Sequence, residues 1–310
     1  MDRADALNLP NMVQLGIPFF ILFVIAEIIA WRSGSRVRYE TRDTAASLAM
    51  GFGNIVVGAL SAIFIGGLFG LAWERRIFAL GSAWWVFLVA VVVQDFVYYW
   101  FHRLSHEHRW FWAAHVPHHS SQHYNFSTAL RQSWAKPLHG LYVLALPAIM
   151  LGVRPEIYAF ASGINLLYQF WIHTEWIDRL GPVEWVFNTP SHHRVHHGNN
   201  ARYLAANYAG IFVVWDRLFG TFVAEDRTDP PRYGLVHQLN TFNPLRIAYH
   251  EYGEIIRDWR RSRSWSELWN YTFGPPGWSP DGSRKTATDL KRSWFSRTGR
   301  RTPDPELRGS

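Results

Sequence analysis

Long apolar runs separated by short polar stretches dominate the first half of the chain. Three of them, at residues 12–31, 46–73 and 82–101, have about the 20 residues with which a helix crosses the hydrocarbon core of a bilayer. Two shorter runs, at 138–153 and 156–172, form a close pair that either spans twice or enters and leaves from one side as a re-entrant hairpin. We therefore predict an all-α integral membrane protein with about four or five membrane segments.

The basic residues orient these segments. The loop at residues 32–42 carries four arginines, and loops rich in Lys and Arg remain on the cytoplasmic side of a membrane. If the segments at 46–73 and 82–101 each cross the membrane once, the chain leaves the cytoplasmic side and returns to it, so residues 102–123 lie on the cytoplasmic side. Residues 173–197 fall on the same side whether or not the paired segments cross fully. We therefore expect a multi-pass membrane protein with a cytosolic, histidine-rich cap.

The composition narrows the possible partners and sites. The chain of 310 residues has no cysteine, which excludes disulfides, thiolate metal sites and iron–sulfur clusters. Its formal net charge of +7 is better explained by basic cytoplasmic loops than by a nucleic-acid partner, and we expect none. No dinucleotide-binding, P-loop or Gly-x-Ser-x-Gly motif occurs.

The chain divides into three expected regions. Residues 1–45 hold the first membrane segment and the basic loop, and residues 46–250 hold the other apolar segments and all 15 histidines. Residues 251–310 form an Arg-rich tail, of which we predict 284–310 to be weakly ordered because its composition is polar.

Nine of the 15 histidines fall into four groups at the ends of apolar segments. Imidazole is the commonest side-chain metal ligand and suits iron, zinc, copper and nickel. Nine ligands are too many for one ion and about right for two, and histidines four residues apart share a helix face. We therefore predict a two-metal centre on the cytoplasmic side. Its expected ligands are His102, His106, His115, His118, His119, His173, His193, His196 and His197.

Other histidines lack this spacing. His192 precedes His193 and would point away from it on a helix, so the His-x-x-His-His phase favours His193. We expect the remaining unpartnered histidines not to be ligands: His108, His123, His139 and His250. Pro117 interrupts any helix through the second group, so we expect that group to begin a helix.

Three polar residues inside apolar segments are candidates for supporting roles. Asp95 lies on the helical stripe of His102, and an ionisable residue in a membrane segment suggests function. We expect it to orient a ligand histidine, although packing against another segment is the alternative. Asn165 and Gln169 share a stripe with His173. They either bond a ligand imidazole or a metal-bound water, or they bond between helices.

These motifs resemble the fatty acid hydroxylase / sterol desaturase superfamily of membrane diiron enzymes, with its His-x(3)-His and His-x-x-His-His boxes. Within it the chain looks most like the alkylglycerol monooxygenase branch. The resemblance covers roughly residues 45–250. The stretches that carry it lie at 98–103, 118–121, 125–133, 169–175, 188–198, 207–208 and 215–222.

The resemblance implies two irons and O2-dependent oxidation of a lipid C–H bond. In the alkylglycerol branch an ether lipid from the bilayer is hydroxylated beside its oxygen, and the hemiacetal collapses to an aldehyde and a glycerol. That branch uses tetrahydrobiopterin, and the alternative electron source is a reductase partner. By the same resemblance Glu107 is a candidate pterin contact, although a solvated role is equally expected, and His237 is a candidate site residue.

Three alternatives remain open at this stage. Another enzyme of the superfamily would hydroxylate or desaturate a sterol, a fatty acid or a carotenoid. A membrane metal-binding or transport protein would place histidines through the membrane rather than at one side of it. A zinc-dependent membrane hydrolase would act without O2.

Overall fold

A computed structural model describes residues 7–300, and every extended regular element in this range is a helix. This confirms the all-α prediction. In chain order the helices are α1 (Met12–Arg32), α2 (Thr41–Glu74), α3 (Trp84–Glu107), α4 (Arg109–His119), α5 (Phe126–Ala129), α6 (Lys136–His139), α7 (Leu146–Met150), α8 (Pro155–Trp171), α9 (Pro190–His196), α10 (Val214–Leu218), α11 (Pro244–Trp259), α12 (Trp265–Phe273) and α13 (Ala287–Thr298), with 3-10 helices η2 (Leu141–Ala145) and η3 (Gly181–Trp185).

Three helices, α1, α2 and α3, are long and apolar enough to cross a membrane. They coincide with the first three predicted segments. The fourth predicted segment is not one helix, because Gly140 adopts a positive φ of 76° and only η2 and α7 follow it. Those ten residues rise roughly 15–20 Å, well short of the hydrocarbon thickness. Their length favours the re-entrant alternative for the pair.

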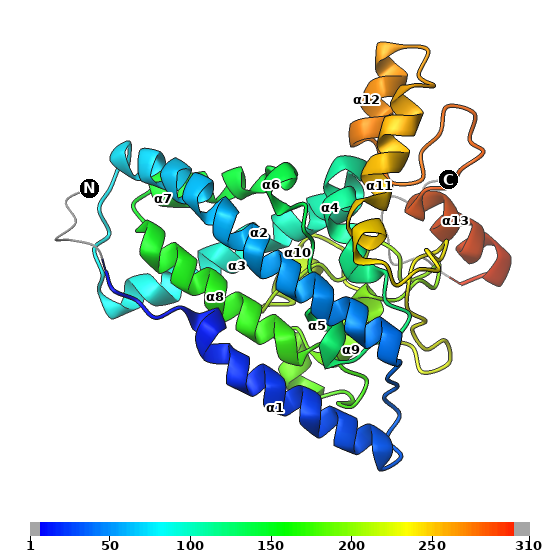
Figure 1. Cartoon of the computed structure of the whole chain (residues 1–310), viewed down its shortest axis with the longest axis horizontal. Coiled ribbons are helices and arrows are strands. Elements are labelled where there is room, and N and C mark those ends of the chain that lie inside the picture. The colour runs from blue at the N-terminus through cyan, green and yellow to red at the C-terminus, as the bar shows by residue number, and fades with distance from the viewer. Residues whose placement is uncertain (1–6, 301–310) are drawn as a thin grey trace.

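Helix α8 lies between α1 and α3 and packs against both (Figure 1). Small residues make the contact with α3 close, because Ala90 of α3 and Ala161 of α8 are both buried in the same apolar cluster. Val86 and Ile157 fill the rest of that layer and are inaccessible to solvent. The result is a bundle whose outer faces, especially those of α1 and α2, stay apolar and exposed, as lipid contact requires.

Helix α2 is rich in glycine, but only two of its glycines serve close packing. A Cβ at Gly53 would lie 2.2 Å from the ring of Trp134, and one at Gly51 would lie 2.8 Å from the carbonyl oxygen of Leu130. The segment after α5 therefore lies directly on α2. The other glycines of α2 have no neighbour within 4 Å in the described part of the chain.

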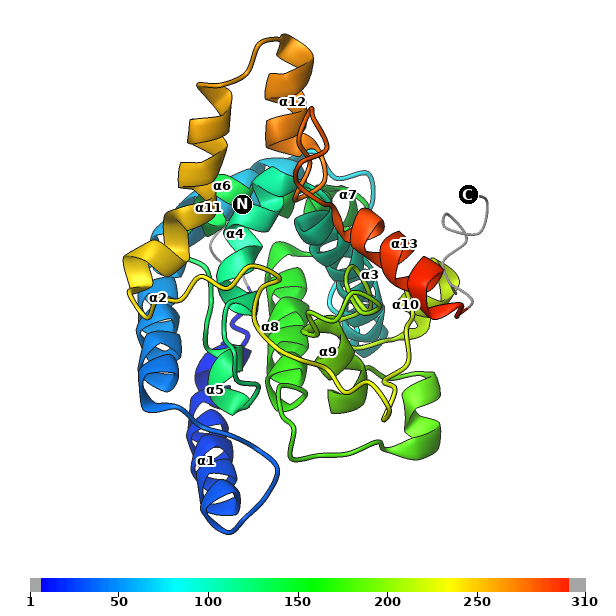
Figure 2. The same ribbon diagram turned by 90° about the vertical axis from the view of Figure 1, so that its right-hand side faces the viewer.

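The shorter helices α4, α5 and α9 gather where α2 begins and α8 ends (Figure 1, Figure 2). The α11–α12 hairpin projects from this cap in both views. Arg109 of α4 fastens it, because its buried guanidinium bonds Glu251 at 2.7 Å and Asp258 at 2.6 Å. The cap and the hairpin thus share α4, which carries three of the nine histidines.

The structure corrects the expectation for the tail. Residues 287–298 form α13, and its first turn is closed by a capping box between Thr286 and Asp289. Lys291 of α13 donates to the backbone oxygen of Ala205, so the helix is tied to the cap. Composition misled here because a short polar helix gains its stability from caps and tertiary contacts rather than from an apolar face. The rest of the predicted weakly ordered stretch, 301–310, lies outside the described residues.

The expected region boundaries fall within helices. The boundary at 45/46 lies inside α2, which begins at Thr41, and the boundary at 250/251 lies inside α11. A division of the chain into regions therefore remains a proposal about sequence rather than about separable folding units.

Candidate metal centre

Four elements bring all nine candidate histidines to one end of the bundle. Helix α3 carries the first pair in its last turns, and α4 carries the next three. His173 follows α8 by two residues, and α9 with its C-cap residue His197 carries the last three. None of them lies near the other end of the membrane helices, which argues against a histidine path through the membrane.

The nine histidines form two adjoining groups. Within each group, one ring nitrogen of every member lies within 4.8 Å of those of all the others. The rings of His119 and His197, one from each group, are only 4.3 Å apart. The first group is His102, His106, His115, His119 and His196, and the second is His118, His173, His193 and His197.

Helical phase explains this division. Histidines four residues apart on one helix always fall in the same group, since they share a face. The residue at i+3, which is His118 or His196, points to the other group. Pro117 lies in the last turn of α4 rather than at a helix start, so that expectation is wrong. The residues before Pro117 already form about two turns, and the histidines close the helix.

Backbone carbonyls fix the protonation of four rings. A carbonyl oxygen only accepts, so each bonded Nδ1 carries the proton and each Nε2 keeps a free lone pair. The Nδ1–H donations run from His102 to Tyr208 (2.8 Å), His118 to Arg131 (3.3 Å), His173 to Gln169 (2.6 Å) and His196 to Ala206 (3.0 Å).

These lone pairs face one another across a gap of metal-ligand dimensions. Nε2 of His118 and Nε2 of His173 are 3.1 Å apart, although neither has a proton to share. Among the described residues, the buried Nε2 atoms of His106, His196 and His197 have no hydrogen-bond partner. Ligand nitrogens lie about 2.0–2.1 Å from a bound metal, and neighbouring ones are then about 3 Å apart. The two groups therefore fit two metal ions of the imidazole-binding kind.

The electrostatics keep these rings neutral and ready to bind. Burial lowers the pKa of His173 to about 4. Burial, reinforced in most cases by neighbouring imidazoles, lowers the pKa of six further histidines well below its usual value. They are His115, His118, His119, His193, His196 and His197. A neutral imidazole is the form that coordinates a metal.

Asp216 holds the carbonyl that orients His102. It is inaccessible to solvent, and it accepts the backbone N–H groups of Tyr208 at 2.7 Å and Ala209 at 2.9 Å. Burial raises its pKa to about 6. The carbonyl of Tyr208, which receives the His102 Nδ1–H, is thereby fixed, because it shares one planar peptide unit with the Ala209 N–H. Asp216 occupies the supporting position that we expected of Asp95.

Asp95 is fully buried but does not contact a candidate ligand. It accepts four hydrogen bonds, from Asn165 Nδ2 (2.8 Å), the backbone N–H groups of Ile211 (2.7 Å) and Phe212 (3.0 Å), and Trp215 Nε1 (2.9 Å). The expectation that it bonds a ligand imidazole is therefore replaced. Its carboxylate instead holds the segment at the start of α10 against α3. A charged group inside an apolar helix is tolerated only when all of its hydrogen bonds are made, as they are here.

Asn165 and Gln169 form an amide chain between α8 and α3. Asn165 donates to Gln94 at 2.9 Å as well as to Asp95, and Gln169 accepts from the Tyr98 hydroxyl at 2.7 Å. Their side chains thus make inter-helix bonds, and only the backbone oxygen of Gln169 touches a candidate ligand.

Arg194 links the last histidine motif, at residues 193–197, to the chain that follows His173. Its guanidinium makes a two-pronged bond to Glu225, at 2.9 and 2.8 Å, and also donates to the carbonyls of Thr174 and Ile177. Both charged groups are largely buried. The pair therefore sets the position of α9 relative to the end of α8.

The structure places two predicted residues away from the histidine groups. Glu107 is half-buried and bonds Arg103 one turn earlier on α3, at 2.8 Å. His237 is exposed and belongs to neither group. Their roles stay predictions.

Comparisons with known proteins agree with this geometry. Residues 87–221 match the family model described as fatty acid hydroxylase. The chain is 38% identical over 284 residues to alkylglycerol monooxygenase of Homo sapiens, and equally to that of Xenopus tropicalis; each match covers 89% of this chain and 62% of the relative. The chain therefore spans about three fifths of the length of these relatives. Ornithine lipid hydroxylase OlsE of Rhizobium tropici is 29% identical over 145 residues, covering 47% of this chain and 42% of that protein. No solved structure matches.

Proposed function

We propose that the chain, whose residues 87–221 match the fatty acid hydroxylase family model, is a membrane-bound diiron oxygenase acting on lipids. It inserts one oxygen atom of O2 into a C–H bond of a lipid chain, and the other atom leaves as water with two electrons and two protons from a donor. The observation that carries the proposal is the pair of adjoining, all-histidine groups with unshared, inward-facing nitrogens.

The similarity to alkylglycerol monooxygenases favours an ether lipid as the substrate. The carbon beside the ether oxygen is hydroxylated, and the hemiacetal so formed breaks its C–O bond to give a fatty aldehyde and a glycerol. The reaction is then complete without a further redox step. A relative named for ornithine lipid hydroxylation supports a second candidate, which is hydroxylation of a different lipid class by the same centre.

The nine histidines would hold the metals, and two bound irons would supply the electrons that cleave O2. The protein's own task is to keep the ligands neutral, oriented and dry. Burial keeps the imidazoles unprotonated, and Asp216 and the backbone carbonyls fix their Nδ1 protons outward. Exclusion of water protects an oxidising centre from reactions other than that with the lipid.

The electron donor and the orientation are parts of the same proposal. Tetrahydrobiopterin is the favoured donor because of the similarity to the alkylglycerol branch, with Glu107 as a candidate contact; a reductase is the alternative. The arginine-rich loop between α1 and α2 supports a multi-pass arrangement with the histidine centre on the cytoplasmic side.

The test is a turnover assay on iron-loaded protein in membranes. The protein is given an alkylglycerol or an ordinary acyl lipid, with O2 and either tetrahydrobiopterin or a reductase system. We expect fatty aldehyde from the alkylglycerol only, dependent on O2 and abolished in His118→Ala. A hydroxylated or desaturated acyl lipid without aldehyde would retain the oxygenase and reject the ether-lipid substrate. Turnover without O2 would reject both the oxygenase reaction and the ether-lipid substrate.

A further inference from the structure

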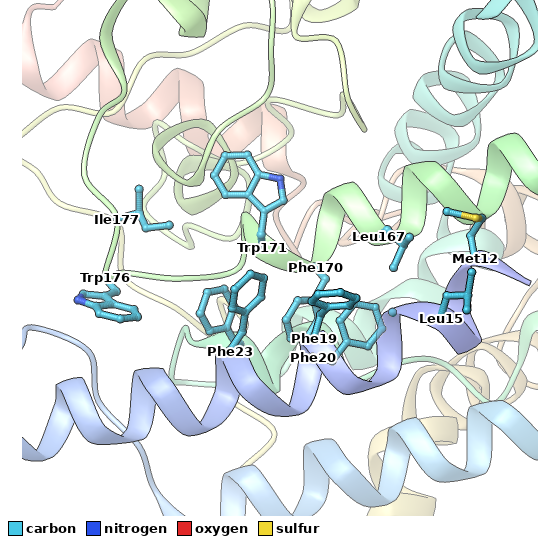
Figure 3. Close-up of a pocket in the computed structure, with 12 residues that line it drawn as sticks. Met12, Leu15, Phe19, Phe20, Phe23, Leu167, Phe170, Trp171, Trp176 and Ile177 are labelled. Atoms are coloured by element: carbon cyan, nitrogen blue, oxygen red, sulfur yellow. The ribbon is translucent and has the colours of Figure 1, made fainter. Parts of the chain in front are cut away.

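An apolar groove runs between α1 and the C-terminal half of α8, with a volume of about 810 Å³ (Figure 3). One stripe of α1, from Met12 to Phe23 at helical spacing, forms one wall. Leu167 and Phe170 of α8 face it, and Trp176 and Ile177 close the end beside the cap. Its volume lies in the range of small-molecule sites, and its lining side chains are all hydrophobic or aromatic.

The groove has the length of one lipid tail. The stripe of α1 from Met12 to Phe23 rises about 17 Å along the helix, close to half of a hydrocarbon core that is about 30 Å thick. It therefore has about the depth of one leaflet, and its Phe23 end, beside Phe126 and Phe170, is the end nearest the histidine centre.

The floor of the groove lies beside the second histidine group. Phe126 and Phe170 stack on each other in the floor, with ring centroids 5.4 Å apart. His173 follows Phe170 by three residues, and Tyr124, two residues before Phe126, has its ring 5.8 Å from that of His173. Two short backbone segments thus separate the groove from candidate metal ligands.

We propose that this groove binds the alkyl tail of the lipid substrate, and that α1 thereby selects the tail. The inference rests on the proposed function, because it assumes that a lipid is oxidised at the histidine centre. Helix α1 lies outside the residues that match the family model. Because α1 forms one wall of the groove, differences in α1 would give enzymes with the same histidine boxes different preferences for the lipid tail.

Two positions on α1 give a matched test. Phe19 lines the groove and is 61% exposed, whereas Ile21 is 55% exposed, does not line the groove and lies about 200° around the helix from Phe19. A photo-crosslinking amino acid is placed at either position in the full-length, iron-loaded protein, in phospholipid nanodiscs without O2. An alkyne-tagged alkylglycerol is the probe, and unlabelled alkylglycerol is the competitor. Metal content and melting temperature confirm that both variants fold.

We expect saturable labelling at Phe19 that falls at least tenfold with competitor, and weak, unsaturable labelling at Ile21. Equal, unsaturable labelling at both positions would overturn the groove, since it would show ordinary boundary lipid. Labelling at Phe19 that is displaced at much lower concentration by an acyl lipid of equal tail length than by alkylglycerol would keep the groove and reject the ether-lipid substrate. The second variant Leu15→Trp fills the groove and should shift turnover toward shorter tails, whereas an unchanged tail-length profile would contradict the proposal.

Discussion

The carboxylate of Glu27, fully buried in the membrane helix α1, accepts a hydrogen bond from the hydroxyl of Thr174, the residue directly after His173. The same carboxylate accepts from the Tyr39 hydroxyl at 2.5 Å and from the backbone N–H of Phe126 at 2.8 Å. Helix α1 is thus latched to the chain on both sides of the second histidine group, although it supplies no histidine itself.

Removing this latch should destabilise the protein. Glu27→Ala leaves three donors without their acceptor, at about 1–3 kcal/mol for each buried one, so we expect a loss of at least about 3 kcal/mol in the free energy of unfolding. Glu27→Gln should cost less because it keeps one acceptor. Denaturant or thermal unfolding in detergent measures the change, with Leu22→Ala on the exposed face of α1 as the control. Equal stability of Glu27→Ala and the control would show that the latch contributes nothing.

Asp216 should control metal affinity without being a ligand. In Asp216→Asn, the amide group cannot accept both backbone N–H groups, so the Tyr208 carbonyl loses its fixed position behind His102. We expect a metal affinity about 10- to 100-fold lower, as for other groups that orient ligands. Competition with a chelator measures the affinity, and Asp178→Asn, at a surface ion pair, is the control. An affinity that equals that of the control would reject this role.

The metal-free protein should lose stability on acidification. Folding lowers the pKa of seven cap histidines, including His173 at about 4, so the unfolded chain binds more protons below about pH 6.5. Their contribution is fully present above that pH and is lost as the pH falls toward the folded-state pKa values. Each such group changes the free energy of unfolding by up to about 1.4 kcal/mol per pH unit.

Asp216 works in the opposite direction, because its pKa is raised to about 6 and it favours folding as the pH falls through that value. One such group does not offset seven. We therefore expect the melting temperature of metal-free protein to change little between pH 7.5 and pH 6.5 and to fall from pH 6.5 to pH 5.5. A flat profile over that interval would contradict the burial of neutral histidines.

Much of the site was predictable from sequence because its spacing is local. Histidines at i and i+4 share a helix face whatever the rest of the fold does, and all nine predicted residues lie in the two groups. The same rule predicts the pairs within each helix, but not the group that His173 joins. Length and composition likewise identified α1, α2 and α3 as candidate membrane spans.

The supporting residues were not predictable in this way, because their partners are distant in sequence. Asp95 shares a stripe with His102, yet its carboxylate bonds a segment more than a hundred residues later. Asp216 stands between two short apolar runs, at 211–215 and 218–219, and Glu225 stands in a polar stretch; in neither case does the sequence name the partner. Glu27 did carry a signal, since an acidic residue in an apolar segment requires a partner, but the sequence does not say which.

The most direct test of the account is the iron content of the purified chain and of two variants, one in each histidine group. We expect two irons per chain in the wild type and about one in both His106→Ala and His193→Ala, with two retained in the control His250→Ala. One iron per chain in the wild type, or an unchanged content in both variants, would contradict a two-metal centre built from these nine histidines.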